Sequence, residues 1–355
     1  MSKQGLISIC MPTLNARRFL SERLDTLLSQ TFTDWEIIVC DSYSNDGTWE
    51  FLQKFNSDSR IRLYQVPKEG LYAGWNECLR RARGEFVYFA TADDTCHPVL
   101  LEKMVASLCR PVSAHAQRAT DIAVCNFDYI DEEGRVIKPV LPPAGAFYGD
   151  SRYVAHTRSG YVEFLVHMLI GTSWTTMTSV LFRRSLLEKT GLFRTDCGEL
   201  ADRFWAYKAA VHSDTAVVPE TLATWRQHVD QGSFRAAKMN VFPRMQALRR
   251  LWRATVETLD ECSPWLPAQW TRDSDYRDKL LWAERRHYFD QYHLTKTALR
   301  YRPGEFVSGV MSGLIMEPSF VMRRLLSGLV WAKDDKMSEV VYLRNLMRLW
   351  SCESM

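Results

Sequence analysis

Short apolar runs alternate with amphipathic stretches along the first 110 residues of the chain. The run LISICMPTL (6–14) precedes a stretch that places Phe19, Leu20 and Leu24 on one helical face. The same succession recurs after the apolar runs at 35–40, 61–66 and 85–91. Such alternation predicts an α/β fold with a mostly parallel sheet flanked by helices.

The pattern changes further along the chain. Residues 122–183 mix strand-like runs with a helical stretch near 162–169, and the Pro/Gly-rich segment 139–150 is expected to be a mobile surface loop. From about Ser233 onward, apolar, Trp and Arg positions recur only at helical spacing. The sequence therefore predicts a sheet-containing domain over 1–235 and an all-helical domain over 236–355.

Composition places the chain among folded proteins with a mild charge. Of 355 residues, 46% are hydrophobic and 25% charged, so a sizeable core is available. The net charge is only +3, which argues against nucleic acid as the main partner because such binders concentrate far more Lys and Arg. The excess of positive charge falls from residue 236 onward, where 19 Lys and Arg face 14 Asp and Glu.

The cysteines and the N-terminus favour a reducing compartment. The nine cysteines form no C-x-x-C pair and no His-spaced metal cluster, so we expect reduced thiols in the core. The start MSKQGLISIC lacks the charged and apolar regions of a signal peptide, and no run of 18 uncharged apolar residues occurs. These features predict a cytoplasmic protein.

The loops that leave the carboxyl ends of the predicted strands carry the candidate chemistry, because such loops form the ligand crevice of a parallel sheet. Asp93 and Asp94 follow the strand EFVYFAT. Two adjacent carboxylates repel each other, and a hard divalent ion shared with phosphate oxygens would relieve that repulsion. The alternative is a structural Asp at a turn and helix start.

A second set of polar residues follows the first two strands. Asp41 could accept from a base N–H or a ribose hydroxyl, and Thr13, after Pro12, could offer its hydroxyl to a nucleotide. Asn15 is expected to cap the helix that follows. Neither G-x-G-x-x-G nor the P-loop pattern is present, which disfavours dehydrogenases and ATPases.

Taken in order, these elements resemble glycosyltransferase family 2 and its GT-A fold over roughly 6–235. The resemblance rests on a series of short motifs rather than on any one of them. The series is Pro12-Thr13-Leu14-Asn15, Asp41 to Thr48, Gly70-Leu71-Tyr72 with Asn76, Ala82 with Gly84-Glu85, Ala92-Asp93-Asp94 as a form of the family's D-x-D motif, and a later G-x-F before an acidic helix.

The resemblance implies a nucleotide-sugar donor held with Mn²⁺ or Mg²⁺. It makes Asp94 the metal ligand and gives Asp93 a contact with the ribose or with the water shell of the metal. It also gives Thr13 and Asp41 to the nucleotide base, and Glu69 to the border of the ribose. Pro12, Asn15 and Asn76 lie in the same donor-binding motifs.

The resemblance further implies a catalytic base in an acidic helix, where Asp202 matches the family's position. Ala201 replaces the usual Glu, so Glu199 is the competing candidate, and Asp202 at a helix start also fits a plain N-cap. In Trp225-Arg226-Gln227-His228, the histidine could reach the diphosphate or the metal, although a structural role is equally compatible. Trp174 fits either an acceptor-site aromatic or a core residue.

The function that follows is single-sugar, inverting transfer from a nucleotide-sugar, most simply a UDP-sugar, to a glycan or lipid-linked glycan. The Q-x-x-R-W motif of processive synthases is absent in that form, since Gln246 and Arg249 are followed by Arg250. Two rivals stay open: a nucleotide-sugar-binding subunit without catalysis, suggested by Ala201, and a sugar nucleotidyltransferase, which lacks its Gly-rich loop here.

The helical tail is expected to contact a membrane surface, a partner chain or only the catalytic domain. Its segment 304–332 is apolar but interrupted by Glu317, Pro318 and the pair Arg323-Arg324, so it could lie in an interface without spanning it. A basic, aromatic surface of this kind could approach lipid-linked glycans along an anionic leaflet. The sequence thus allows peripheral attachment at the inner face of the membrane or homo-oligomerisation.

Overall fold

The computed structural model describes residues 5–110, 118–137, 143–171, 173–174, 176–228, 241–281 and 336–350. The chain divides into two compact units, one of residues 1–164 with 172–228 and the other of residues 165–171 with 229–355. The boundary predicted at residue 235 lies outside the described residues.

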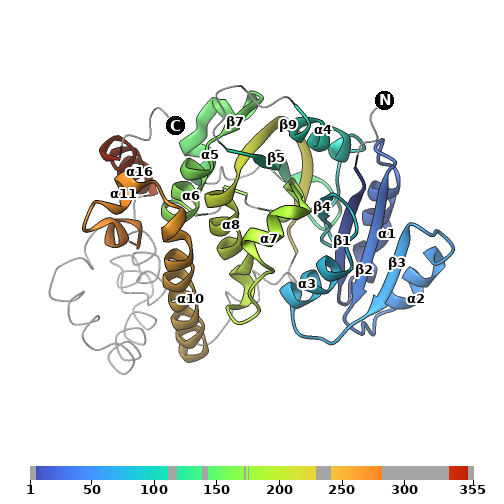
Figure 1. The fold of residues 1–355 in the computed structure, drawn as a ribbon. Coiled ribbons are helices and arrows are strands. Elements are labelled where there is room, and N and C mark those ends of the chain that lie inside the picture. The colour runs from blue at the N-terminus through green and yellow to red at the C-terminus, as the bar shows by residue number, and fades with distance from the viewer. Residues whose placement is uncertain are drawn as a thin grey trace. The chain divides into compact units, whose positions relative to one another are not determined.

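The first unit is built on a mixed nine-stranded sheet in the order β3-β2-β1-β4-β8-β5-β9-β7, with β6 paired to β5. In Figure 1 β3, β2 and β1 lie at one end of this sheet and β5, β9 and β7 at the other. The strands are β1 (Ile7–Thr13), β2 (Trp35–Asp41), β3 (Ile61–Gln65), β4 (Phe86–Phe89), β5 (Thr120–Ile130), β6 (Val136–Ile137), β7 (His156–Arg158), β8 (Val180–Arg183) and β9 (Asp214–Arg226).

Strands β1 to β4 pair in parallel, as the alternation of strand and helix predicts. The remaining strands do not: β8 runs antiparallel to both β4 and β5, β7 runs antiparallel to β9, and only β5 and β9 are parallel. The antiparallel β8 brings its first residue, and the last residues of β5 and β9, to the edge where β1, β2 and β4 end. All the site residues predicted from the sequence are therefore drawn from segments that reach one edge of the sheet.

Helices cover both faces of this sheet. They are α1 (Arg17–Leu28), α2 (Thr48–Leu52), α3 (Leu71–Arg81), α4 (Leu100–Leu108), α5 (Pro143–Tyr148), α6 (Gly160–Leu169), α7 (Leu187–Thr190) and α8 (Ala201–His212). Alternate residues of β1 and β2, such as Ile9 and Val39, share a buried cluster with Leu24 of α1 and Met104 of α4. On the opposite face, α3 packs on β1 and β2.

Aromatic rings bind α3 and α8 to that second face. Trp75 of α3 stacks on Phe89 of β4, with ring centroids 4.6 Å apart, and Phe182 of β8 lies 4.8 Å from Trp205 of α8. Burial of these large rings fixes the start of α8 relative to the sheet. The result is an α/β/α arrangement that holds Asp202, the second residue of α8, close to α3.

The Pro/Gly-rich segment corrects one prediction. Residues 143–150, expected to belong to a mobile loop, form α5 and the start of a 3-10 helix, η2 (Gly149–Tyr153). The hydroxyl of Tyr148 donates to the buried carboxylate of Glu163, and this contact anchors the segment to α6. A tertiary hydrogen bond to a buried charge outweighs the local preference of Pro and Gly for turns.

The described part of the second unit outside 165–171 is helical, with α10 (Val241–Cys262), η6 (Ser263–Trp265), α11 (Ala268–Thr271) and α16 (Lys336–Leu349). Trp270 stacks on Trp350, with ring centroids 5.1 Å apart. The segment 304–332, which motivates the expected membrane contact, lies outside the described residues. None of the helices in the described ranges is long and apolar enough to cross a bilayer.

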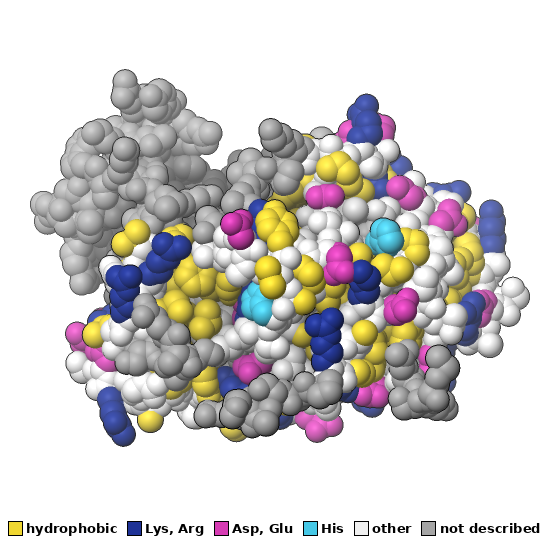
Figure 2. All heavy atoms as spheres, turned by 90° about the horizontal axis from the view of Figure 1, so that it is seen from above, with side chains coloured by type: hydrophobic (Ala, Val, Ile, Leu, Met, Phe, Trp, Pro, Cys, Tyr) yellow, Lys and Arg dark blue, Asp and Glu magenta, His cyan; other side chains and the backbone are white. Residues whose placement is uncertain are grey.

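Charged side chains of both signs are mixed on the surface, and most of the described cysteines are buried thiols. On the face drawn in Figure 2, Lys and Arg side chains are interspersed with Asp and Glu. This mixed distribution offers no continuous basic track on that face. None of the eight cysteines in the described ranges forms a disulfide, and all but Cys109 are buried.

Candidate active site

The ends of β1 and β2 meet in a hydrogen-bonded group centred on Asp41. Thr13 donates its hydroxyl to Asp41 Oδ1 at 2.9 Å, and Ser44 donates its hydroxyl to the same oxygen at 2.6 Å and its backbone N–H to Oδ2 at 2.9 Å. Asp41 is completely buried. Three donors satisfy its charge, and a carboxylate has about four acceptor positions, so one position is left for a further donor.

Asn15 does not cap α1, contrary to the prediction from the sequence. The helix begins at Arg17 with Ala16 in the N-cap position, and Asp46 of the neighbouring loop accepts the backbone N–H of Arg17 at 3.0 Å. Asn15 has φ 51° and instead accepts from the backbone N–H of Asn45 at 3.0 Å. The cap thus comes from a residue 29 positions away in sequence, which a local pattern cannot reveal.

Asp94 is almost entirely buried, and hydrogen bonds occupy both of its oxygens. Oδ2 accepts from the hydroxyls of Thr91 at 2.5 Å and Thr178 at 3.3 Å, and Oδ1 accepts from the backbone N–H of Arg226 at 2.7 Å. Burial raises the pKa of Asp94, and the neighbouring Asp93 raises it further. Asp94 therefore ties β4 to β8 and β9.

Asp93 points the other way and meets His228. Its Oδ2 lies 3.0 Å from Nε2 of His228, and the two side chains are 25% and 11% exposed. The His228 ring packs against Phe19 with centroids 5.0 Å apart. This separation is that of a hydrogen bond between the carboxylate and the imidazole, and both groups are of the kinds that bind divalent cations in proteins.

In the structure Asp94 accepts from protein donors with both oxygens, whereas Asp93 is partly exposed and pairs with His228. No group of three or more His, Cys, Asp and Glu side chains suited to a metal occurs among the residues that the structure describes. Mn²⁺ or Mg²⁺ would thus need further oxygens, and a diphosphate supplies them. Asp93 and His228 fit such a shared metal site.

Arg226 holds these two side chains in place. Its guanidinium is 1% exposed and donates to the backbone oxygen of Asp93 at 2.6 Å, to the backbone oxygen of Asp131 at 3.0 Å and to Glu22 Oε2 at 2.6 Å. Because Arg226 precedes His228 by two residues, it fixes both partners of the Asp93–His228 pair. Arg226 is part of the motif Trp225-Arg226-Gln227-His228, but the sequence predicts a functional role only for the histidine.

Asp202 lies in the first turn of α8 and faces Tyr72 of α3. The Tyr72 hydroxyl donates to Asp202 Oδ1 at 2.9 Å, and the backbone N–H of Arg203 donates to the same oxygen at 2.9 Å. No hydrogen bond from the described residues uses Oδ2. Burial raises the pKa of Asp202, whereas the Tyr72 hydrogen bond lowers it.

Two donors hold Oδ1 of Asp202, and Oδ2 is left to accept a proton. A general base needs such an arrangement. Glu199, the competing candidate, lies in the 3-10 helix η5 (Gly198–Leu200) before α8, and its side chain lies outside the described part of the chain. Tyr72 belongs to the motif Gly70-Leu71-Tyr72, but the sequence did not predict its contact with the candidate base.

Comparison with known proteins identifies the family of the chain. The family model described as Glycosyl transferase family 2 matches residues 8–190, slightly more than half of the chain. The chain belongs to glycosyl transferase family 2. This confirms the resemblance inferred from the ordered motifs, and the matched residues include β1, the Asp93-Asp94 pair and β8.

Among curated relatives, UDP-Glc:alpha-D-GlcNAc-diphosphoundecaprenol beta-1,3-glucosyltransferase WfgD of Escherichia coli is 36% identical over 104 residues, which are 29% of this chain and 41% of WfgD. Chondroitin synthase of Escherichia coli is 27% identical over 39% of this chain and 19% of the synthase. The chain spans about half or less of the length of the curated relatives with the strongest matches.

Solved structures share the fold at low identity. S. aureus TarS 1-349, determined in complex with UDP-GlcNAc, has a TM-score of 0.61 at 16% identity, with 98% of this chain and 91% of that chain covered. Mannosyltransferase PcManGT from Pyrobaculum calidifontis, in complex with GDP-Man and Mn²⁺, has a TM-score of 0.50 at 17% identity over 99% and 89%. The α/β fold predicted from the sequence, a GT-A sheet flanked by helices, is confirmed.

Asn76, Pro12 and Glu69 are the remaining residues predicted to bind the donor. Asn76 is buried and spends its side-chain amide on the backbone of Phe193, donating to the oxygen at 2.8 Å and accepting from the N–H at 3.0 Å. It therefore links α3 to the segment before α8. Pro12 is buried in β1, and Glu69 is exposed in the loop before α3.

Proposed function

We propose that the chain transfers one sugar from a nucleotide-sugar to a hydroxyl group of a glycan or lipid-linked glycan, with inversion and with Mn²⁺ or Mg²⁺. The observation that carries the proposal is the presence, in one unit, of a carboxylate–imidazole pair suited to a metal and of a carboxylate base held by a tyrosine. Membership of family 2 and neighbours solved with UDP-GlcNAc and GDP-Man support a nucleotide-sugar donor.

We place the donor along the edge from β2 to the Asp93 loop. We assign Thr13 and Asp41 to the base, and Glu69 to the ribose. Asp93 and His228 would hold the metal ion, which neutralises the leaving diphosphate when it is bound. Since TarS was solved with UDP-GlcNAc and WfgD is named for UDP-Glc, a UDP-sugar is the donor we favour.

In this proposal Asp202 removes the proton from the acceptor hydroxyl through Oδ2, while the hydrogen bond from Tyr72 keeps Oδ1 and the carboxylate plane fixed. The activated oxygen attacks the anomeric carbon in line with the departing diphosphate, so one displacement inverts the configuration. The acceptor named for WfgD is a diphosphoundecaprenol-linked sugar, and this supports a lipid-linked glycan as one acceptor class. The helical tail is the part we propose to meet a membrane surface or a second copy.

A donor screen tests the proposal. The purified chain is incubated with UDP- and GDP-sugars, and the release of nucleoside diphosphate is measured with and without a chelator. We expect turnover with a UDP-sugar, a fall of at least about tenfold in excess chelator, and recovery when Mn²⁺ is added. Pyrophosphate release from a sugar phosphate and a nucleoside triphosphate would instead establish a nucleotidyltransferase.

Replacement of Tyr72 by Phe tests the link between α3 and Asp202. Because a hydrogen bond to the ionised carboxylate lowers its pKa, its removal raises the pKa of Asp202 further. The base is active when ionised, so the acid limb of kcat should move to higher pH in Tyr72→Phe. At a pH on that limb we expect kcat to fall roughly tenfold, the effect of about 1.4 kcal/mol, with the donor KM nearly unchanged.

Tyr64→Phe is a matched control, since it removes a tyrosine hydroxyl that contacts Arg62 of the same edge strand rather than Asp202. Its pH profile should coincide with that of the unmodified chain. If Tyr72→Phe lowers kcat by the same factor at every pH, the tyrosine orients the acceptor without tuning the base.

A further inference from the structure

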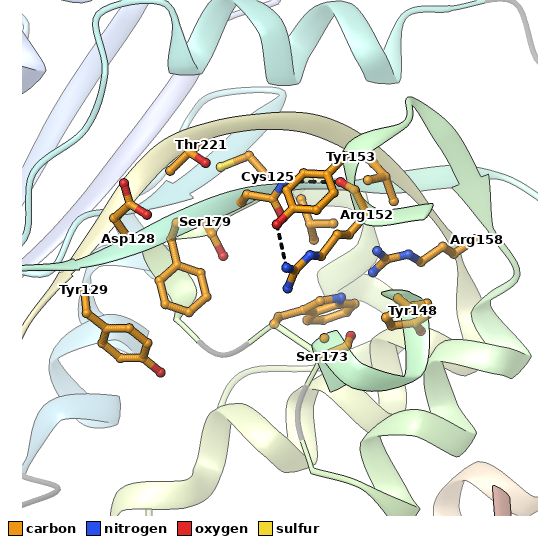
Figure 3. Close-up of a pocket in the computed structure, with 16 residues that line it drawn as sticks. Cys125, Asp128, Tyr129, Tyr148, Arg152, Tyr153, Arg158, Ser173, Ser179 and Thr221 are labelled. Carbon is orange, nitrogen blue, oxygen red and sulfur yellow. Dashed lines mark hydrogen bonds between the residues drawn. The ribbon is translucent and has the colours of Figure 1, made fainter. Parts of the chain in front are cut away.

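A cavity of about 180 Å³ lies between the carboxyl half of β5, the middle of β9 and the segment 145–158 (Figure 3). Liquid water takes about 30 Å³ per molecule, and pockets for drug-sized ligands begin at about 300 Å³. The cavity therefore fits one sugar ring or a group of similar size, and it is too small for a nucleotide-sugar.

Residues that line the cavity are close in sequence to residues that contact the candidate active site. Ser179 lines it, and the preceding residue, Thr178, donates to Asp94 Oδ2. Thr221 also lines it, five residues before Arg226 on the same strand. The cavity thus opens on the β5–β9 side of the Asp93 loop, whereas Thr13 and Asp41 lie on the β1–β2 side.

Two arginines supply positive charge at one end of this cavity. Arg152 donates through Nη2 to the Tyr153 hydroxyl at 2.5 Å, and its Nε is buried without a hydrogen-bond partner in the described structure. The Arg158 guanidinium packs over the Tyr148 ring at 3.6 Å from the centroid, and its side chain is 9% exposed. Figure 3 shows both guanidinium groups on the same side of the cavity.

One of these charges is balanced within the protein. Glu163 is fully buried and lies 3.5 Å from Arg158 Nη1. Glu163 also accepts hydrogen bonds from Tyr148, from the Ser173 hydroxyl at 2.5 Å and from Trp174 Nε1 at 2.9 Å. It is therefore held in place beside Arg158.

Among the residues that the structure describes, no carboxylate forms an ion pair with Arg152. Asp128 is the carboxylate among the described residues that line the cavity, and it alternates along β5 with Tyr129, so the two side chains point to opposite faces. In Figure 3 the Asp128 carboxylate points away from both guanidinium groups. A buried Nε–H without an acceptor is costly, and an oxyanion would satisfy it together with the charge.

Aromatic side chains line much of the remaining wall. Phe127, Tyr129, Tyr153 and Trp174 come from three segments that are far apart in sequence. Flat apolar faces of this kind pack well against the C–H groups of a sugar ring. The cavity thus combines a surface for a sugar with donors for an anionic substituent.

We propose that this cavity is an acceptor subsite that binds an acidic sugar residue, a ring carrying a carboxylate or a phosphate, whose oxyanion accepts hydrogen bonds from Arg152. The proposal rests on the proposed sugar transfer and names the acceptor class for it. The same chemistry could come from a uronic acid or from a sugar phosphate, and the experiment below separates the two.

The test measures binding of small probes to the full chain with saturating UDP and Mn²⁺, so that the donor side is filled. Saturation-transfer NMR or calorimetry gives the affinities of methyl glucuronide, glucose 6-phosphate, methyl glucoside and inorganic phosphate. We expect at least one of the acidic sugars to bind about 10- to 100-fold more tightly than methyl glucoside. In Arg152→Gln that preference should disappear, and raised salt should weaken it in the unmodified chain.

Arg80→Gln is the matched control, because Arg80 is exposed on α3 and forms an ion pair with Glu77. It should keep the preference for acidic sugars, and a thermal scan of each variant verifies that it is folded. The subsite would be overturned if methyl glucuronide and glucose 6-phosphate both bound no more tightly than methyl glucoside. It would also be overturned if folded Arg152→Gln kept the preference for acidic sugars. Inorganic phosphate binding as tightly as both acidic sugars would show an oxyanion site that does not recognise the ring, and would also overturn it.

These outcomes are separate from the proposed function. A chain that releases UDP from a UDP-sugar but shows no preference for acidic sugars keeps its function and loses the subsite. A chain that releases no nucleoside diphosphate from any donor loses the function, whatever the cavity binds.

Discussion

Asp93→Asn should reduce metal-dependent turnover roughly 10³-fold, the effect of about 4 kcal/mol of lost charge stabilisation. Asparagine keeps the size of the side chain and can still contact His228, but it lacks the negative charge that a divalent cation requires. The binding of UDP in the presence of Mn²⁺ should weaken in parallel, while metal-free UDP binding changes little. Titration of turnover against Mn²⁺, with calorimetry for UDP, measures both effects.

Asp94→Asn distinguishes the role of Asp94 from that of the adjacent Asp93. Because Asp94 accepts from Thr91, Thr178 and the backbone of Arg226, its replacement should lower the melting temperature by disturbing these links. Asp58→Asn is a control for charge removal, as Asp58 is a surface partner of Arg60. If Asp94→Asn removed the Mn²⁺ dependence of UDP binding and Asp93→Asn did not, the metal ligand would be Asp94 after all.

Asp202→Asn should lower kcat on the order of 10²–10⁴-fold, the usual range for loss of a general base. The amide oxygen can still accept from Tyr72, so the local structure and the affinity for UDP with Mn²⁺ should persist. Single-turnover measurements of transfer, alongside UDP binding, distinguish a lost chemical step from lost donor affinity.

Two further variants complete that experiment. Asp196→Asn removes an acidic side chain of the same segment that pairs with Arg194, and it should retain activity. Glu199→Gln tests the competing base. A large loss in Glu199→Gln together with a small loss in Asp202→Asn would transfer the role of base to Glu199.

Peripheral membrane contact stays a prediction for the tail, since the stretch 304–332 that suggests it lies outside the described residues. By contrast, the sequence alone established the family and the fold. Strand-like and helix-like periods identify β1 to β4 and their helices, because burial on both faces of a parallel sheet leaves a continuous apolar run. The rule that ligands bind at the carboxyl ends of such strands then located the loops of Asp41 and Asp93.

Tertiary structure decided which protein groups each of the two adjacent carboxylates contacts. Asp93 and Asp94 are equivalent in a sequence, and their directions are fixed by Thr178 and Arg226, which lie 84 and 132 positions from Asp94. The same holds for Asn76, whose amide is consumed by the backbone of Phe193, 117 positions away.

The cavity that we propose for acidic sugars also depends on long-range contacts alone. Its walls come from β5, the segment 145–158, Trp174 and β9, and the first residues of that segment belong to the stretch 139–150 that its Pro and Gly content predicted to be a loop. Local propensity and periodicity report what each residue prefers among its sequence neighbours. A buried charge such as Glu163 outweighs those preferences by drawing donors from distant segments, and only the folded chain shows which donors those are.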